Sequence, residues 1–148
     1  TAAVRILSLA ARLRAQGRTV ADALADLVRR YGLYRTAQLS FRVADLALIA
    51  DAMARLRARP PATLAGEPVH ATDLAEGWSE LPPTDAVLLE GPSVRVTVRP
   101  SGTEPKLKCY LQTVLDPAAS ADLDAARATT EATLTALKAE LTSALRLA

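Results

Sequence analysis

The stretch "AVLLEGPSVRVTVR", Ala86–Arg99, has a two-residue period that determines the centre of the predicted fold. Valine occupies every second position from 94 to 98, and arginine or threonine occupies the positions between. Side chains of a strand point to alternate faces, so this pattern is typical of a strand with one buried face. The run Val87–Glu90 precedes it across Gly91 and Pro92, which are turn residues. The stretch therefore predicts an antiparallel β-hairpin.

Two further segments have the same alternation. Apolar or small residues occupy the odd positions from 107 to 113, with Lys, Tyr or Gln between them, and Leu39, Phe41 and Val43 alternate with Ser40 and Arg42. Each segment predicts a strand. Residues 62–85 are interrupted by prolines and glycines. We expect loops there, with one short strand near Pro68–Thr72.

Apolar residues at helical spacing predict four helices around these strands. A first helix up to Gly17 and a second from the cap Thr19 to Gly32 form a helical hairpin. The stripe of the second helix is predicted to be buried, and consists of Val20, Leu24, Leu27, Val28 and Tyr31. A third helix runs from the cap Asp45 to Pro60 and carries Leu46, Ile49, Ala50, Met53 and Leu56.

A long closing helix is predicted from Asp116 as the cap and Pro117 as the first residue. Its apolar stripe is expected to lie on a face of the sheet, and consists of Leu123, Ala126, Thr130, Leu134, Leu137, Leu141 and Leu145. The order strand, helix, several antiparallel strands, helix predicts an α+β fold with the helices on one face of the sheet.

The composition narrows the classes of function. Of the 148 residues, 50% are hydrophobic, 3% are aromatic and 23% are charged, and the formal net charge is +2. No cluster of basic residues and few stacking side chains are present, which disfavours a nucleic-acid partner. Cys109 is the lone cysteine, as expected of a cytoplasmic protein, and His70 is the lone histidine, so no metal site is predicted. No apolar run is long enough to predict a membrane span.

The segment "RPSGTEPKLKCY", Arg99–Tyr110, gathers groups that bind anions. Arg99 offers a planar fork of donors, and the hydroxyls of Ser101 and Thr103 can also donate. Gly102 is expected to let successive backbone N–H groups point into one concavity, and Lys108 shares a strand face with Lys106. These residues predict an anion site, and a plain hairpin loop is the alternative, because Ser, Gly, Thr and Pro are ordinary turn residues.

The same segment resembles the C-terminal phosphate-binding loop of the α-D-phosphohexomutase superfamily, the phosphoglucomutases and phosphomannomutases. The string Arg-Pro-Ser-Gly-Thr-Glu-Pro is a hallmark of that family, and the Lys-Leu-Lys-Cys-Tyr continuation resembles its long bacterial branch, which has phosphopentomutase relatives. The segments "YGLYRTAQLSFRV" and "VLLEGPSVRVTV" resemble the entry to the last domain and its central hairpin. The resemblance covers essentially the whole chain.

The resemblance implies a TATA-binding-protein-like antiparallel sheet in residues 35–148, with residues 1–34 as the end of the preceding domain. It implies that Arg99, Ser101, Gly102 and Thr103 hold the non-transferring phosphate of a sugar phosphate, with Lys108 as a further candidate, while Glu104 fixes the loop. The whole enzyme would interconvert the 1- and 6-phosphates of a hexose, using Mg²⁺ and a hexose 1,6-bisphosphate.

The family's phosphoserine loop, its Asp-rich magnesium loop and its sugar loop have no counterpart in this sequence. No catalytic residue and no metal ligand are therefore expected in the chain, which is predicted to be an inactive part of a longer mutase that needs its N-terminal domains. A free-standing module that binds phosphorylated ligands is the alternative, and the sugar, whether glucose, mannose or a pentose, stays open.

Overall fold

The computed structural model describes residues 1–80, 82–119 and 122–147. The chain divides into two compact units, one of Thr1–Tyr34 with Leu115–Arg127 and one of Arg35–Val114 with Ala128–Ala148. The four helices are α1 (Ala2–Ala15), α2 (Val20–Tyr31), α3 (Ala47–Ala58) and α4 (Leu123–Leu145). The strands are β1 (Leu33–Arg42), β2 (Thr63–Leu64), β3 (Glu67–Pro68), β4 (His70–Asp73), β5 (Val87–Glu90), β6 (Val94–Pro100) and β7 (Lys106–Leu115), and a short 3₁₀ helix spans Leu74–Glu76.

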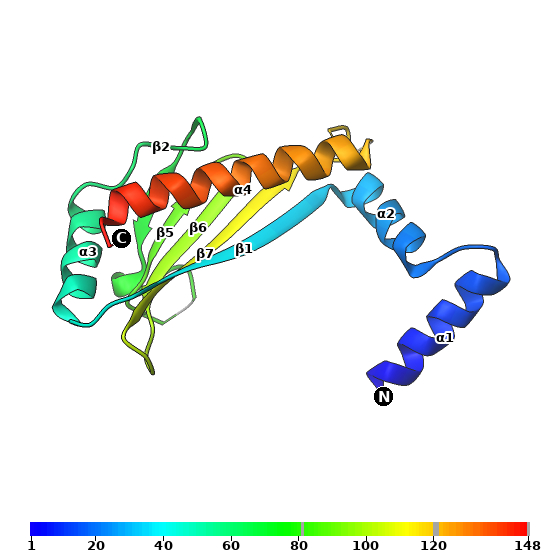
Figure 1. The fold of residues 1–148 in the computed structure, drawn as a ribbon, viewed down its shortest axis with the longest axis horizontal. Coiled ribbons are helices and arrows are strands. Elements are labelled where there is room, and N and C mark those ends of the chain that lie inside the picture. Colours follow the sequence, from blue (N-terminus) through cyan, green and yellow to red (C-terminus); the bar gives the residue numbers. More distant parts are fainter. Residues whose placement is uncertain (81, 120–121, 148) are drawn as a thin grey trace. The chain divides into compact units, whose positions relative to one another are not determined.

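An antiparallel sheet with the strand order β1-β7-β6-β5-β4 forms the second unit, and its helices lie on one face (Figure 1). The predicted hairpin is confirmed, because Val87 of β5 lies opposite Val98 of β6 and Glu90 lies opposite Arg95. The segment predicted to be mostly loop also contains the two-stranded sheet β2-β3. The α+β class with helices on one face is therefore confirmed.

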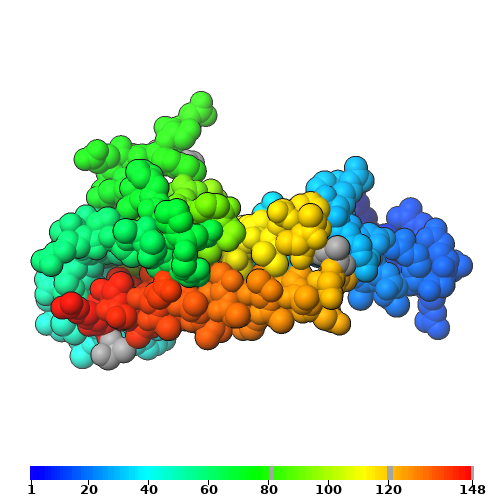
Figure 2. Space-filling view, turned by 90° about the horizontal axis from the view of Figure 1, so that it is seen from above, coloured from blue at the N-terminus to red at the C-terminus, as the bar shows by residue number. Residues whose placement is uncertain are grey.

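The core of the second unit fills the space between the sheet and α3 and α4. The alternating residues of the strands meet there with Ile49, Met53 and Leu56 of α3 and with the C-terminal part of the α4 stripe, as the sequence predicts. Leu46 and Ala50, also expected on the stripe of the third helix, are exposed instead. The largest fully buried side chains are Met53, Leu64, Leu89, Leu107, Leu111, Leu134, Leu137, Leu141, Leu145, Val87, Val96 and Val98. Figure 2 shows the C-terminal end of α4, in red, beside α3, and Arg55 Nη2 of α3 donates to the carbonyl of Leu145 at 2.9 Å.

The start of the closing helix differs from the prediction. Asp116 and Pro117 precede a turn, in which Asp116 Oδ1 accepts from the backbone N–H of Ala119 at 2.9 Å. The helix starts later, because the carboxylate of Asp122 accepts from the N–H groups of Asp124 and Ala125 and caps it there. Two aspartates compete for the role of cap, and the second one begins the helix.

The first unit contains the predicted helical hairpin. Thr19 and Asp22 form a reciprocal capping box at the start of α2, and this bonding to Thr19 lowers the pKa of the Asp22 carboxyl. Gly32 ends α2 with φ of +91°, and a Cβ there would meet the carbonyl oxygen of Leu115 at 2.3 Å. No other residue type therefore fits this position without a shift of the backbone.

The predicted burial of the α2 stripe is wrong. No residue of α2 is buried, and Leu24 and Tyr31 are 57% and 56% exposed. The period of the sequence predicts the apolar side of a helix correctly, but it does not say whether this chain supplies the surface that covers that side.

Candidate functional site

The candidate loop connects β6 to β7 and is held by backbone hydrogen bonds. The N–H of Ser101 donates to the carbonyl of Lys106 at 2.9 Å, and the N–H of Lys106 donates to that of Glu104 at 2.8 Å. The N–H of Val43, just after β1, donates to the carbonyl of Pro105 at 3.1 Å. The loop is thus fixed from within and from the neighbouring strand.

Arg99 and Lys108 lie directly opposite each other on β6 and β7. Their chain neighbours Val98 and Cys109 are fully buried, so Arg99 and Lys108 lie on the sheet face that points away from the core, called here the outer face. Within the described residues, no carboxylate comes within ion-pair distance of either. Two like charges in a cross-strand pair repel each other, and an anion between them would relieve that repulsion.

Glu104 connects the loop to two strands. Its Oε2 accepts from Arg42 Nη2 of β1 at 2.9 Å, and its Oε1 lies 2.8 Å from Lys106 Nζ of β7. The hydrogen bond from Lys106 is the main cause that lowers the pKa of the Glu104 carboxyl, and the charges of Lys106, Arg42 and Lys108 act in the same direction. This geometry matches the role expected for Glu104, which is to fix the loop.

Ser101 has a buried Oγ with no hydrogen-bond partner in the described part of the chain. A buried hydroxyl without a partner costs about 1–3 kcal/mol, so a ligand oxygen or a water molecule that accepted its proton would be favoured. A hollow of about 410 Å³ lies beside this residue. Its lining consists of Leu46, Ile49, Ala50, Met53, Ala54, Arg57, Asp85, Pro100 and Ser101.

Gly102 and Thr103 are exposed at the tip of the loop. The conformational reason predicted for Gly102 is wrong, because its φ is not positive and a Cβ there would meet no atom within 4 Å. Neither backbone conformation nor packing within this chain requires glycine at this position. A glycine would still serve if a ligand approached the backbone closely.

The loop end of the outer face is cationic. In the described part of the chain, Arg42, Arg99, Lys106 and Lys108 lie at this end, and the carboxylate of Glu104 pairs with Arg42 and Lys106. Arrays of this kind bind phosphate or carboxylate groups.

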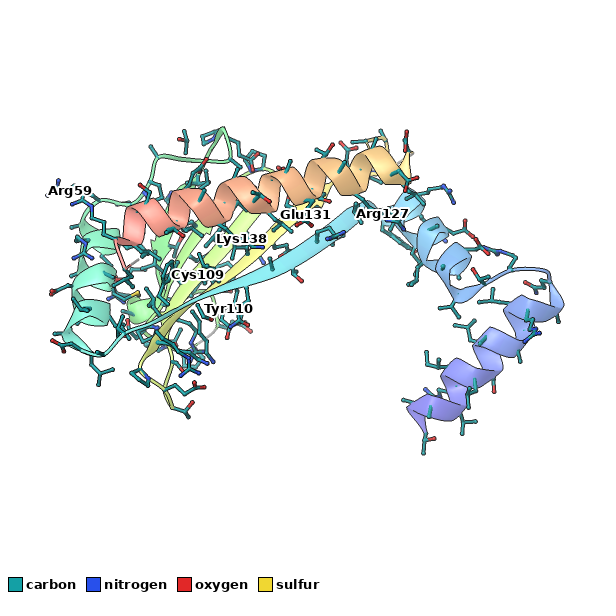
Figure 3. The ribbon with its side chains drawn as sticks, in the orientation of Figure 1. Arg59, Cys109, Tyr110, Arg127, Glu131 and Lys138 are labelled. Atoms are coloured by element: carbon teal, nitrogen blue, oxygen red, sulfur yellow. The ribbon has the colours of Figure 1, made fainter. Side chains whose placement is uncertain are left out.

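Cys109 lies on the opposite face of β7 from its neighbour Tyr110 (Figure 3). It is buried, and that burial raises the pKa of its thiol to about 12, so the thiol stays protonated and unreactive. His70 is exposed on the edge strand β4. Across the described ranges, no three His, Cys, Asp or Glu side chains form a group that could hold a metal ion.

Sequence reasoning missed Arg42. It lies at the end of a strand far from the loop in sequence, and only the pairing of β1 with β7 brings it to Glu104. The alternation of residues 39–43 predicts the face of the strand on which Arg42 lies. The local sequence does not show which strand pairs with this one, so it could not place Arg42 beside the loop.

Comparisons with known proteins show what the chain is similar to. Residues 40–130 match the family described as "Phosphoglucomutase/phosphomannomutase, C-terminal domain". Over 113 residues the chain is 38% identical to a protein of Haemophilus influenzae described as "Probable phosphomannomutase". The match covers 75% of this chain and 23% of that relative, so the chain spans about a quarter of the length of the protein it resembles.

Proposed function

The chain belongs to the phosphoglucomutase/phosphomannomutase family as a C-terminal domain, and we propose that it binds the phosphate group of a phosphorylated sugar. The binding residues are Arg99, Ser101, Gly102, Thr103 and Lys108, with Glu104 holding the loop that carries them. The observation that carries the proposal is the cross-strand pair of Arg99 and Lys108, which has no carboxylate partner in the described residues. The unsatisfied Ser101 hydroxyl follows Arg99 by two residues along the chain.

The complete enzyme, on this proposal, is an intramolecular phosphotransferase that interconverts the 1- and 6-phosphates of a hexose. This chain grips the phosphate that is not transferred and so positions the hydroxyl that reacts. Binding energy from a remote group becomes useful for catalysis only through such positioning. The same loop would hold either phosphate of a bisphosphorylated intermediate, since a phosphate in either orientation presents the same oxygens.

On this proposal the catalytic and metal-binding parts of that reaction lie outside this chain. Among its described residues, no three His, Cys, Asp or Glu side chains form a group that could hold Mg²⁺. We assign the phosphorylated nucleophile, the ion and most contacts with the sugar to other domains of the enzyme, and we expect this chain to be inactive alone.

The test is an NMR titration of the 148-residue chain with glucose 6-phosphate, inorganic phosphate and glucose. We expect the amides of Ser101, Gly102 and Thr103 to shift with both phosphate compounds and not with glucose. Absence of any shift at these amides, both here and in the longer enzyme that contains the chain, would reject the proposed function.

A further inference from the structure

The outer face of β6 and β7 continues from the cationic pair toward neutral residues. Thr97 lies opposite Tyr110, and Arg95 lies opposite Gln112, in the two steps that follow Arg99 and Lys108. Each step of two residues along a strand covers about 7 Å. A compact ligand with its anionic end at Arg99 would therefore extend over Thr97 and Tyr110.

A hollow of about 530 Å³ lies on this face at those two steps. Its lining comes from β1, β6 and β7 and consists of Thr36, Ala37, Gln38, Arg95, Thr97, Tyr110, Leu111 and Gln112. Hydroxyl and amide groups predominate among these lining residues, and Tyr110 adds an aromatic ring. Volumes of this size are typical of sites for small molecules.

The polar groups of the hollow are available to a ligand. Within the described residues, the side chains of Thr97, Tyr110 and Gln112 make no hydrogen bond, and Tyr110 is 42% exposed on the face away from α4 (Figure 3). Gln38 uses its Nε2 to donate to Ser40 Oγ at 3.0 Å, which leaves its carbonyl oxygen free. The hollow thus offers both donors and acceptors beside a flat apolar ring.

The charge of the hollow differs from that of the loop end. Its one cation, Arg95, is held by Glu90, with Nε and Nη2 at 2.9 Å and 2.5 Å from Oε1. The hollow is therefore close to neutral, whereas Arg99, Lys106 and Lys108 gather at the loop. This gradient along one face suits a ligand with an anionic head and an uncharged, hydroxyl-rich body.

We propose that the hollow on the outer face is a sugar subsite, in which the body of a phosphorylated sugar lies on Tyr110 while its phosphate is held at the loop. The amides of Gln38 and Gln112 and the hydroxyl of Thr97 bond to the sugar hydroxyls. This inference rests on the proposed function, because the loop must first hold the phosphate. It adds contact with the sugar ring to the role of this domain, which the proposed function limits to binding the phosphate.

The test compares two ligands on the same 148-residue chain, glucose 6-phosphate and inorganic phosphate, each with the wild type and with Tyr110→Ala. We expect Tyr110→Ala to lower the affinity for glucose 6-phosphate by roughly three- to tenfold and to leave the affinity for inorganic phosphate unchanged. Tyr31→Ala is the matched control, since Tyr31 is also exposed but lies on α2, outside the hollow. It should change neither affinity.

The outcomes separate this inference from the function on which it rests. If the loop amides shift with both ligands but the ring resonances of Tyr110 shift with neither, the sugar subsite is wrong and the phosphate site stands. An equal loss of both affinities in Tyr110→Ala, or no loss of either, also overturns the subsite.

Gln112→Ala provides a second variant on the same face and should lower only the affinity for glucose 6-phosphate. If neither ligand shifts the loop amides, in this chain and in the longer enzyme that contains it, both proposals are rejected.

Discussion

The two faces of β7 belong to one strand but differ in the burial of their side chains. Leu107, Cys109 and Leu111 face the core and are at most 1% exposed, whereas Lys108 and Tyr110 stand on the outer face. The core face contributes to the stability of the unit, and we propose that the outer face binds the ligand. The comparison indicates that changes on one face should alter stability alone and changes on the other should alter binding alone.

The largest difference between the two faces is expected in the loss of stability caused by Leu111→Ala. Leu111 is 1% exposed in the core, and removing its buried methyl groups leaves a cavity, so the free energy of unfolding should fall by about 2–5 kcal/mol. Urea denaturation measures this loss. Gln112→Ala, one residue away on the outer face, should lie within about 0.5 kcal/mol of the wild type. Equal losses in both variants would contradict the division between the faces.

A smaller loss of stability is expected from Cys109→Ser. The side chain is fully buried, and its pKa of about 12 reflects an apolar environment. A serine hydroxyl without a partner there should cost about 1–3 kcal/mol of unfolding free energy, while Cys109→Ala should show only the loss of packing. Urea denaturation of both variants distinguishes these costs. A serine variant more stable than the alanine variant would show that the site can bond a hydroxyl.

The smallest effect on stability is expected from protonation of Glu104, in the loop between β6 and β7. Its carboxyl pKa is lowered from an ordinary 4.5 in the folded chain, chiefly by Lys106. The contribution of Glu104 to stability is therefore present above pH 4.5 and is lost as the pH falls through the lower folded pKa. NMR titration of the carboxyl should give a midpoint below 4.5 that rises toward 4.5 in Lys106→Met. An unchanged midpoint in this variant would remove Lys106 as the cause.

Much of the fold could be predicted from the sequence because local period reports which face of an element is apolar. The alternation from Val94 to Val98 and the stripe of α4 lead directly to the observed core. The start of α4 could not be fixed, since Asp116 and Asp122 both have the chemistry of a cap. Whether the α2 stripe is buried depends on whether another surface covers it, and the spacing of apolar residues in the sequence does not contain that information.

The candidate site was predictable only in part. The residues of the loop stand together in sequence, so their types alone indicate an anion site. Arg42 reaches the loop through the pairing of β1 with β7, and the hollow around Tyr110 is formed by three strands, so both depend on tertiary structure. That the Ser101 hydroxyl has no partner among the described residues follows from the tertiary structure and not from the sequence.

The most direct test of the phosphate site compares Arg99→Ala with Arg95→Ala, two arginines on the outer face of the same strand. Inorganic phosphate binding and thermal unfolding are measured for both variants. Arg99→Ala should weaken phosphate binding by roughly 2–4 kcal/mol at an unchanged melting temperature, because a charged ligand loses its partner. Arg95→Ala should keep the affinity, since Arg95 is occupied by Glu90. Wild-type phosphate affinity in Arg99→Ala would contradict the assignment of the loop.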